Sequence, residues 1–318
     1  MSETTRPRPH RQRLRAGDAF LVGTGALAAL LLAGHRLVPG DLGVFLDSGL
    51  PWVGLLILPA AAGALLLRSR AGLAAVGVAS LVWAFLFLPA YVPGLGAGNG
   101  SDTGAGRLTV ATLNIDAENP DPCGALREAS GWGADVVAVE EITGPAECAS
   151  SALGENGTWI RQGTVGLWSR HPVGGPAPLD IFRGLRATVH APGGDVVVLV
   201  GHVASLRPRA VGERNDSLEA LAADAEAEGE GPVVVAGDMN TAATDRAMDV
   251  FDGFGEAQRA AGWGPGFTWS SSASMVRLDH VFYRGMEARS AGVREVPGSD
   301  HRGVVAELAY GRPAGPAG

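Results

Sequence analysis

The stretch VVVAGDMN at residues 233–240 places four apolar residues directly before a Gly-Asp-Met-Asn segment. Short apolar runs rich in β-branched residues are typical of buried strands. Polar side chains at the end of such a strand can converge with those of other strands on a shared cleft. Asp238 and Asn240 are therefore candidate site residues, although Gly-Asp-x-Asn alone is also a plausible turn.

Polar residues stand in the same way beside several other apolar segments. They are Asn114 ending VATLN, Glu141 ending DVVAVEE, His202 ending VVLVGH, Asp279 within RLDHVF, and Asp300-His301 before GVVAEL. Taken singly, each has a structural explanation, such as a turn-forming asparagine, a solvated glutamate or a structural histidine. Taken together, they form the carboxylate, amide and histidine set that metal-assisted phosphoryl hydrolysis requires.

The residue types suit a hard divalent cation. Glu141, with Asn114 close by, offers the oxygen ligands that Mg²⁺ or Mn²⁺ prefers, and such an ion keeps several waters. The ion neutralises phosphate charge and stabilises the attacking or leaving oxygen. Asp238 can orient or deprotonate the attacking water, and Asn240 can donate to a phosphate oxygen or to the nucleophile.

The histidines suit the phosphate itself. His301, oriented by an acid such as Asp279, can remain cationic near the phosphate and stabilise or protonate it. His202 is a candidate second phosphate contact. Which group acts as general base, Asp238 or a histidine, stays open at this point.

The pattern along the second part of the chain predicts an α+β layered sandwich rather than a doubly wound parallel sheet, because strands are many and helices few. The expected strands are residues 107–113, 135–139, 165–169, 185–190, 196–200, 233–236, 277–283 and 303–308, with helices near 122–132 and 218–228.

Seven ordered motifs resemble those of the endonuclease/exonuclease/phosphatase superfamily. They are TLN (112–114), DVVAVEEI (135–142), GLWSRHPV (166–173), GH (201–202), GDMN (237–240), RLDHVF (277–282) and SDHRGVVAEL (299–308). The resemblance covers essentially all of residues 107–310. It implies a four-layer α/β/β/α sandwich with a metal-dependent phosphoric ester hydrolase activity. The sequence departs from the superfamily's usual pattern at Glu140, where glutamine is common, and at Met239, where phenylalanine is common.

The resemblance also implies roles for individual residues. Glu141 is the expected principal metal ligand, Asn114 lies in the same site, and Asp300 assists at the metal or at the histidine. Asp238 and Asn240 handle the water and the phosphate. The remaining roles are those of Asp279 orienting His301, and His202 contacting the phosphate.

Three apolar stretches precede this domain: Ala19–Val38, Leu50–Leu67 and Ala71–Val92. Each is close to the roughly 20 residues that cross a bilayer as a helix. Arginines precede the first stretch and flank Ser69 between the second and third, whereas the intervening loop carries Asp41 and Asp47. Since arginine-rich flanks stay cytoplasmic, the pattern predicts a multi-pass cell-membrane protein with an extracytoplasmic catalytic domain. The alternative is that the first stretch is a cleaved signal peptide.

The expected organisation is a basic cytoplasmic N-terminus (1–18), three transmembrane helices (19–92), a Gly-rich linker (93–106), the catalytic domain (107–310) and a disordered tail (311–318). Cys123 and Cys148 are the only cysteines, and both fall on the proposed outer side. In an oxidising compartment they can form a disulfide, with two unpaired buried thiols as the alternative.

The net charge of the second part of the chain and the predicted membrane anchor limit the classes of substrate that we expect. Residues 101–318 contain 17 arginines and 29 acidic residues, a net charge of −12, which disfavours a grip on long nucleic acid. The anchor favours a lipid-linked phosphate or pyrophosphate of the cell envelope, with membrane lipid as a further partner. The architecture also resembles actinobacterial membrane proteins associated with teicoplanin resistance. An anchored extracellular nuclease and a catalytically silent binding module are the alternatives. The loop from Trp263 to Met275 either covers the substrate or simply packs.

Overall fold

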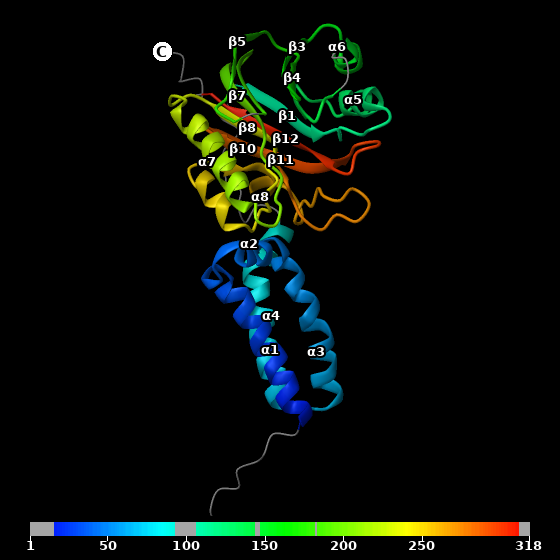
Figure 1. Ribbon diagram of the computed structural model, residues 1–318, viewed down its shortest axis with the longest axis vertical. Helices are drawn as coiled ribbons and strands as arrows, with labels where there is room; N and C mark the ends of the chain where they lie inside the picture. Colours follow the sequence, from blue (N-terminus) through cyan, green and yellow to red (C-terminus); the bar gives the residue numbers. More distant parts are fainter. Residues whose placement is uncertain (1–15, 93–105, 144–146, 182, 312–318) are drawn as a thin grey trace, which may run out of the picture. The chain divides into compact units, whose positions relative to one another are not determined.

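The computed structural model describes residues 16–92, 106–143, 147–181 and 183–311 (Figure 1). The N-terminal arginines, residues 93–105 of the expected linker and residues 312–318 of the expected tail lie outside these ranges. The chain divides into two compact units. The helical unit comprises Met1–Val38 and Leu50–Leu86, and the sandwich unit comprises Pro39–Gly49 and Phe87–Gly318.

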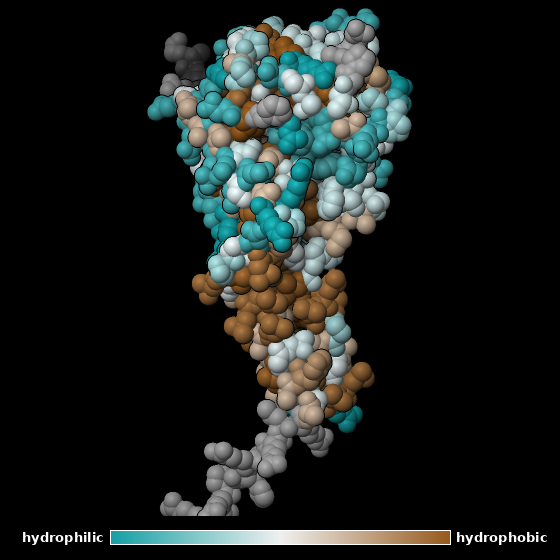
Figure 2. All heavy atoms as spheres, in the orientation of Figure 1, coloured by the Kyte–Doolittle hydropathy of each residue, from teal (hydrophilic) through white to brown (hydrophobic). Residues whose placement is uncertain are grey.

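The helical unit contains three long apolar helices. They are α1 (Ala16–Gly34), α3 (Gly54–Leu66) and α4 (Arg70–Phe87), with the short 3-10 turns η1 (His35–Leu37) and η2 (Leu50–Val53). A further 3-10 turn, η3 (Leu88–Tyr91), directly follows α4 and belongs to the sandwich unit. The segments 16–37, 40–66 and 70–91 are long and apolar enough to cross a membrane. Figure 2 shows apolar side chains over much of the visible surface of these helices, interspersed with residues of intermediate hydropathy. Gly25 allows α1 to pack closely on α4, since a Cβ there would lie 2.8 Å from the Ala75 carbonyl carbon.

Residues 39–49, expected to form a loop between the first two apolar stretches, instead contain the helix α2 (Gly40–Gly49), which belongs to the sandwich unit. Asp47 on this helix is fully buried, and its carboxylate accepts a 2.7 Å bond from Arg246 Nε. The Thr244 hydroxyl donates to the Asp47 carbonyl over 2.6 Å, and the Arg209 N–H donates to Asp41 over 3.1 Å. The acidic residues of this segment therefore hold α2 to the sandwich.

The sandwich consists of two six-stranded mixed sheets. The first has the order β11 (Met286–Glu295), β12 (Arg302–Tyr310), β1 (Gly106–Asn114), β2 (Val136–Glu140), β4 (Val165–Ser169), β3 (Thr158–Gln162). The second has the order β5 (Val173–Pro178), β6 (Gly184–Ala191), β7 (Gly194–His202), β8 (Val233–Asp238), β10 (Asp279–Arg284), β9 (Gly255–Glu256). Each sheet has one parallel pair, β1 with β2 and β7 with β8, and its other pairs are antiparallel.

Apolar side chains of both sheets interlock to form the central core, which includes Leu108, Leu167, Val198 and Leu308. Helices α5 (Pro122–Ser130) and α6 (Glu147–Leu153) cover the outer face of the first sheet, and α7 (Val211–Ala227) with η4 (Arg246–Phe251) covers the second (Figure 1). A short helix, α8 (Ala257–Ala261), follows β9. The expected α+β sandwich of four layers is confirmed.

Four strands were absent from the sequence interpretation: β3, β5, β9 and β11. None of them contains a fully buried run, so their apolar signal is weak. Each is paired through its backbone with a strand whose pattern was recognised, as β11 is with β12 over nine residue pairs. Helix α7 begins at Val211 rather than near Leu218, because its first two turns are polar.

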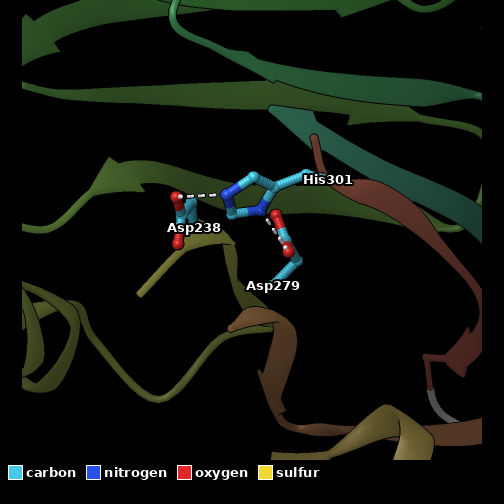
Figure 3. Close-up of side chains that lie close together, drawn as sticks. All are labelled: Asp238, Asp279 and His301. Atoms are coloured by element: carbon cyan, nitrogen blue, oxygen red, sulfur yellow. Dashed lines mark hydrogen bonds and ion pairs between the residues drawn. The ribbon is translucent and has the colours of Figure 1, made fainter. Parts of the chain in front are cut away.

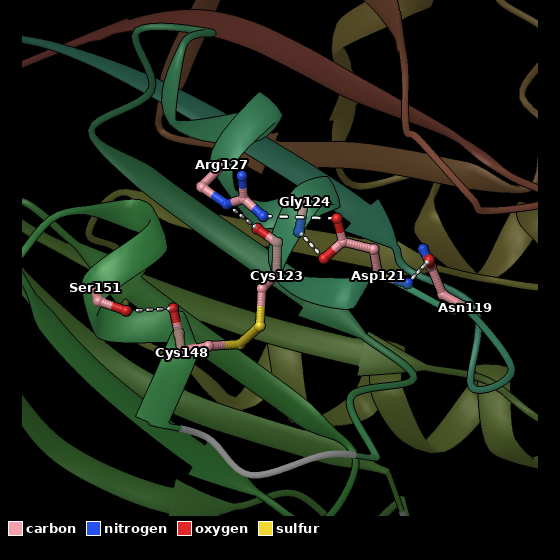
Figure 4. The surroundings of a disulfide bond; sticks show 7 residues. All are labelled: Asn119, Asp121, Cys123, Gly124, Arg127, Cys148 and Ser151. Atoms are coloured by element: carbon pink, nitrogen blue, oxygen red, sulfur yellow. Dashed lines mark hydrogen bonds and ion pairs between the residues drawn. A yellow bond between two sulfur atoms is a disulfide. The ribbon is translucent and has the colours of Figure 1, made fainter.

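Cys123 on α5 and Cys148 on α6 form a disulfide with their Cα atoms 5.9 Å apart (Figure 4). The bond joins the two helices that cover the first sheet. The alternative of two unpaired thiols is therefore wrong for this structure.

Replacing both cysteines with alanine should destabilise the sandwich. The cross-link closes a loop across a sequence separation of 25 residues, and a loop of this length corresponds to about 3–4 kcal/mol of chain entropy. We expect the melting temperature of the purified full chain to fall by about 10 °C. Dithiothreitol should shift the wild type towards the double variant and leave the double variant unchanged, and equal melting temperatures for both proteins would contradict the prediction.

Candidate active site

The strand directions bring the predicted residues to one end of the sandwich. Asn114 and Glu140 pair at the carboxyl ends of β1 and β2, and His202 and Asp238 pair at the carboxyl ends of β7 and β8. Asp279 pairs with Asp238 because β10 runs antiparallel to β8, so that the amino end of β10 lies beside the carboxyl end of β8. Residues far apart in the sequence thereby share one cluster.

His301 lies between two buried carboxylates (Figure 3). Its Nδ1 is 2.9 Å from Asp279 Oδ2, and its Nε2 is 3.7 Å from Asp238 Oδ2. Burial opposes a charge on the imidazole, but Asp279 and Asp238 outweigh it and raise the pKa of His301 to about 10. His301 is therefore a cation at neutral pH, as the sequence argument expected.

Asp238 is the centre of the hydrogen-bond network. Its Oδ2 accepts a 3.1 Å bond from Asn114 Nδ2, and its Oδ1 accepts a 2.8 Å bond from the Asn240 N–H. Burial raises the pKa of this carboxyl, while His301 and His202 lower it. An aspartate held by two amides, with its pKa raised by burial, is well suited to orient a water molecule or accept its proton.

His202 has the opposite electrostatic character to His301. Its Nε2 lies 3.5 Å from Glu141 Oε1 and 3.8 Å from Asp238 Oδ2, and neither ring nitrogen forms a hydrogen bond among the described residues. Burial lowers the pKa of His202 despite the nearby acids. One cluster thus holds a cationic histidine and a neutral one, which is the separation of roles that acid–base chemistry uses.

Glu141 follows β2 with a left-handed backbone, at a φ of +60°. Its Oε2 accepts a 3.0 Å bond from the Ala117 N–H. Burial raises its pKa, but this bond, a hydrogen bond from Asn114 and the nearby cationic His301 outweigh burial and lower the pKa below the ordinary value. Glu141 is therefore an ionised carboxylate whose side chain is partly exposed, as a Mg²⁺ or Mn²⁺ ligand that shares the ion with water and substrate requires.

The Gly-Asp-x-Asn motif has a steric basis. Gly237 has a φ of +151°, and a Cβ there would lie 1.9 Å from the Gly201 carbonyl oxygen on β7. Asn240 is also left-handed, with a φ of +45°, and its Nδ2 donates to the Val203 carbonyl over 3.0 Å. Strained backbone of this kind persists at sites where it positions functional groups, here Asp238 and Asn240.

The residues fit a divalent cation in two ways. In the first position, the ionised Glu141 carboxylate is the ligand and Asn114 lies beside it, with its Nδ2 donating to Asp238 and its Oδ1 accepting a 2.9 Å bond from the Asp116 N–H. In the second position, ligand atoms of Asp238, Asp279 and His301 all lie within 4.8 Å of one another and could hold an ion. Two buried oxygens of the cluster, Asp279 Oδ1 and Glu140 Oε2, accept no hydrogen bond from the described residues. Buried polar atoms normally have a partner, so these oxygens have room for a ligand or water.

Asp300 lies at the rim rather than in the buried cluster. Its side chain is 57% exposed, its Oδ2 accepts a 3.0 Å bond from the Trp269 indole, and its Oδ1 is 4.0 Å from His301 Nε2. Within the described residues, none of its contacts reaches Glu141 or Asn114. Of the two roles that the resemblance implied for Asp300, the position beside the histidine is the one that this geometry supports.

Two residues near the site were not recognised as site residues in the sequence. Arg183 is a half-buried cation that interacts with Glu141 and Asp238, and burial lowers its pKa. Arg183 directly precedes β6, and the amino end of β6 lies beside the carboxyl end of β7 because the two strands are antiparallel. Its position just before an antiparallel strand is the sequence signal that could have identified it. Glu140 is fully buried, its Oε1 accepts from Thr112 Oγ1, and burial and the nearby Asp279 raise its pKa well above the usual range. A protonated glutamate here has the donor and acceptor set of the glutamine that is common in the superfamily.

Glu256 supports the strand that carries Asp279. Its carboxylate is 3.2 Å from Arg277 and 3.7 Å from His280, and it caps α8 through the N–H groups of Gln258 and Arg259. Burial alone would raise its pKa, but Arg277 and His280 outweigh burial and lower the pKa to about 2.

Replacing Glu256 with glutamine should cost about 3 kcal/mol of stability at pH 7. Because the pKa of Glu256 is lower in the folded state, its stabilisation is complete above the unfolded pKa of about 4.3 and is lost as pH falls towards 2. We expect a melting temperature lowered by about 6–12 °C at neutral pH, with a gap that narrows below about pH 4. The exposed Glu295→Gln is the control, and a gap that is constant across pH would disprove the assignment.

A two-sheet sandwich whose strand ends gather an ionised glutamate, a buried aspartate and an Asp-paired histidine has the groups that metal-assisted phosphoryl hydrolysis uses. The sequence profile of the endonuclease/exonuclease/phosphatase family matches residues 111–301, and the chain belongs to this family. It is a metal-dependent phosphoric ester hydrolase, so the alternative of a catalytically silent module is set aside. No curated protein sequence matches the chain.

Solved structures share the fold at low sequence identity. D. rerio TDP2 complexed with a single-strand DNA product has a TM-score of 0.55 at 17% identity, over 64% of this chain and 98% of that chain. The human nocturnin catalytic domain with a bound sulfate anion has a TM-score of 0.53 at 17% identity, over 64% and 94%. A family member from Bacteroides thetaiotaomicron has a TM-score of 0.53 at 16% identity, over 64% and 98%.

Proposed function

We propose that the protein hydrolyses a phosphate ester or pyrophosphate carried by a membrane lipid, at the extracytoplasmic face of the cell membrane, with Mg²⁺ or Mn²⁺. The observation that carries the proposal is that one chain combines three apolar helices with a phosphoesterase site, so that the site works close to a bilayer. The proposal includes a link to teicoplanin resistance, which rests on the resemblance noted above.

In this proposal Glu141 and Asn114 hold the ion, which supplies charge neutralisation at the phosphate when bound. Asp238 orients the attacking water and takes its proton, since its carboxylate is fixed by Asn114 and Asn240. Asn240, whose side-chain amide donates to the Val203 carbonyl and to Asp238, is the further contact that we assign to the phosphate or the water. Arg183 adds a positive charge on the side of Glu141 and Asp238.

The two histidines have different proposed roles at the phosphate. His301, held cationic by Asp279, stabilises the negative charge that develops on the phosphate oxygens or protonates the leaving oxygen. His202 is neutral and donates one ring N–H to a phosphate oxygen, which also supplies the hydrogen bond that its nitrogens lack. Asp300 assists His301 from the rim.

Helix α2 supports the orientation. It is held to the sandwich by Asp47 and Arg246, and it lies in the chain between the first and second apolar helices. The segment between those helices and the catalytic domain are therefore on the same side of the membrane. The Arg68-Ser69-Arg70 turn is then on the opposite side, and arginine-rich turns are cytoplasmic. The disulfide suits the outer compartment.

Orientation can be tested with an alkaline phosphatase reporter fused after Gly106, because this reporter is active only when it is exported. We expect high reporter activity in whole cells, and a matched fusion after Ser69 should be inactive. A reporter that is inactive after Gly106 but active after Ser69 would reverse the topology and exclude an outer-leaflet substrate.

The rival function is an anchored extracellular nuclease, which the single-strand DNA product in the related TDP2 structure brings into consideration. The net charge of −12 after residue 100 disfavours it, since phosphate contacts supply most non-specific affinity for nucleic acid.

The deciding experiment compares substrates on one preparation of the full chain in detergent. Undecaprenyl pyrophosphate, lipid II and plasmid DNA are each supplied with Mg²⁺ or Mn²⁺, or with EDTA. We expect metal-dependent phosphate release from a lipid-linked substrate and little cleavage of DNA. Preferred cleavage of plasmid would replace the proposal with the nuclease, and wild-type activity equal to that of His301→Ala on every substrate would refute both.

A further inference from the structure

Exposed large apolar side chains in the described part of the sandwich unit are confined to three short segments. After Gly106 they are Trp263, Trp269 and Met275, which are 68%, 42% and 51% exposed. All three belong to one loop, residues 262–276, between α8 and β10. We name this segment the aromatic loop. Such clustering is unusual on a soluble surface and marks a site of association.

One end of the aromatic loop contacts the residues that directly follow the third apolar helix. The Gly264 N–H donates to the Ala90 carbonyl over 2.7 Å, and the Trp263 ring meets the Tyr91 ring edge-on at 5.8 Å between centroids. Ala90 and Tyr91 are in η3, which directly follows the last residue of α4. Leu88, Tyr91 and Val92 are themselves 51%, 39% and 41% exposed.

The remaining exposed apolar residues of this unit are on α2, where Leu42 is 71% and Phe45 is 40% exposed. The chain enters and leaves α2 through the first and second apolar helices. Both α2 and η3 are therefore adjacent in sequence to membrane-spanning segments, and the Tyr91–Trp263 contact extends the same region into the catalytic domain.

The other end of the aromatic loop forms part of the active-site rim. The Trp269 indole donates to Asp300 over 3.0 Å, and its backbone forms a bridge with His301. The Ser271 N–H donates to the Asp300 carbonyl over 2.6 Å, and the Arg302 guanidinium donates to the Ser271 carbonyl. The loop therefore runs without a break from the membrane-proximal residues to the residue beside the catalytic histidine.

We propose that the aromatic loop, with η3 and α2, is an interfacial surface that lies in the headgroup region of the bilayer crossed by the same chain. Its occupant is the lipid bilayer, because the chain itself leaves the hydrocarbon at η3 and α2. Tryptophan and tyrosine prefer this depth, since their rings are amphipathic. Through Trp269 the surface places the rim of the active site against lipid headgroups. The inference rests on the proposed lipid-linked substrate, and it specifies how that substrate reaches His301.

The test uses the full chain in nanodiscs of phosphatidylcholine with or without bromine on the acyl chains, which quenches nearby indoles. The emission of each tryptophan is obtained as the difference between wild type and the matching Trp→Phe variant. We expect Trp263 and Trp269 to be quenched, Trp263 to an extent comparable with Trp83 of α4. Trp159 on β3 is the control and should keep its emission. Quenching of Trp263 no greater than that of Trp159 would overturn the inference.

A second measurement separates this inference from the proposed function. Trp263→Ser should lower the ratio of turnover on a bilayer-borne lipid phosphate to turnover on a soluble phosphodiester such as bis(p-nitrophenyl) phosphate. If the lipid substrate is hydrolysed but Trp263→Ser leaves the ratio unchanged, the proposed function stands and the interfacial surface is refuted. If the indoles are quenched but no lipid phosphate is hydrolysed, the interfacial surface stands and the proposed substrate is refuted.

Discussion

Replacing His301 with alanine is expected to lower kcat/KM for any phosphate ester by about 100- to 10,000-fold, the range for loss of a positioned acid or base. The reason is that His301 is a buried cation between Asp279 and Asp238, aimed into the cluster where the phosphate must bind. His190→Ala is the matched control, since His190 is exposed and pairs with Asp195 away from the site. An equal loss in both variants would contradict the assignment.

Replacing Asp279, the hydrogen-bond partner of His301, tests whether His301 acts as a cation, because the replacement should change the pH dependence of activity. The pKa of His301 is about 10, so a step that needs its charge persists to alkaline pH and is lost as pH rises through that value. Asp279→Asn removes the main attraction and should move the pKa towards about 6.5. We expect the variant to lose more activity at about pH 9 than at about pH 6, whereas a parallel pH profile would show that His301 does not act as a cation.

Replacing Glu141 with glutamine is expected to weaken Mg²⁺ or Mn²⁺ binding by at least about 100-fold, beyond the cost of losing an outer-shell partner. The ionised state of Glu141 is maintained by the Ala117 N–H, Asn114 and the cationic His301, and an amide cannot supply the charge. Activity should fall in parallel and be partly restored by excess Mn²⁺. Calorimetric titration of the full chain with Mn²⁺ measures the binding directly.

The exposed Glu155→Gln is the control for this substitution. The experiment also distinguishes the two candidate positions of the ion. If Glu141→Gln binds Mn²⁺ normally while Asp279→Asn does not, the ion belongs to the Asp238, Asp279 and His301 cluster instead. In that case His301 would be a ligand and the expected pH profile of Asp279→Asn would not be observed.

The strand cores and the polar residues that follow them could be recognised in the sequence because burial on both faces leaves near-continuous apolar runs. Asn114, Glu141, His202 and Asp238 each end such a run, so the site could be predicted from strand ends alone. Weakly apolar strands such as β5 and β11 could not, since their place in a sheet depends on a partner strand rather than on their own pattern.

The helices of the helical unit could likewise be recognised in the sequence. A helix needs about 20 apolar residues to cross a bilayer, and few other structures contain apolar runs of that length. Residues 40–49 were not, because their acidic residues resemble a solvated loop. Asp47 is buried only because Arg246 and Thr244, about 200 residues later, supply the hydrogen bonds that a buried carboxylate needs.

The sequence was sufficient to predict the layered sandwich, the three apolar helices and the chemical groups of the proposed site, including a cationic His301. The position of Asp300 at the rim, the approach of Arg183 and the connection of η3 to His301 through the aromatic loop are visible in the three-dimensional structure alone. The physical reason is that a pKa or a contact depends on distances and burial. Asn114 meets Asp238 across 124 residues, and His301 meets Asp279 across 22, through strand pairings that no local pattern encodes.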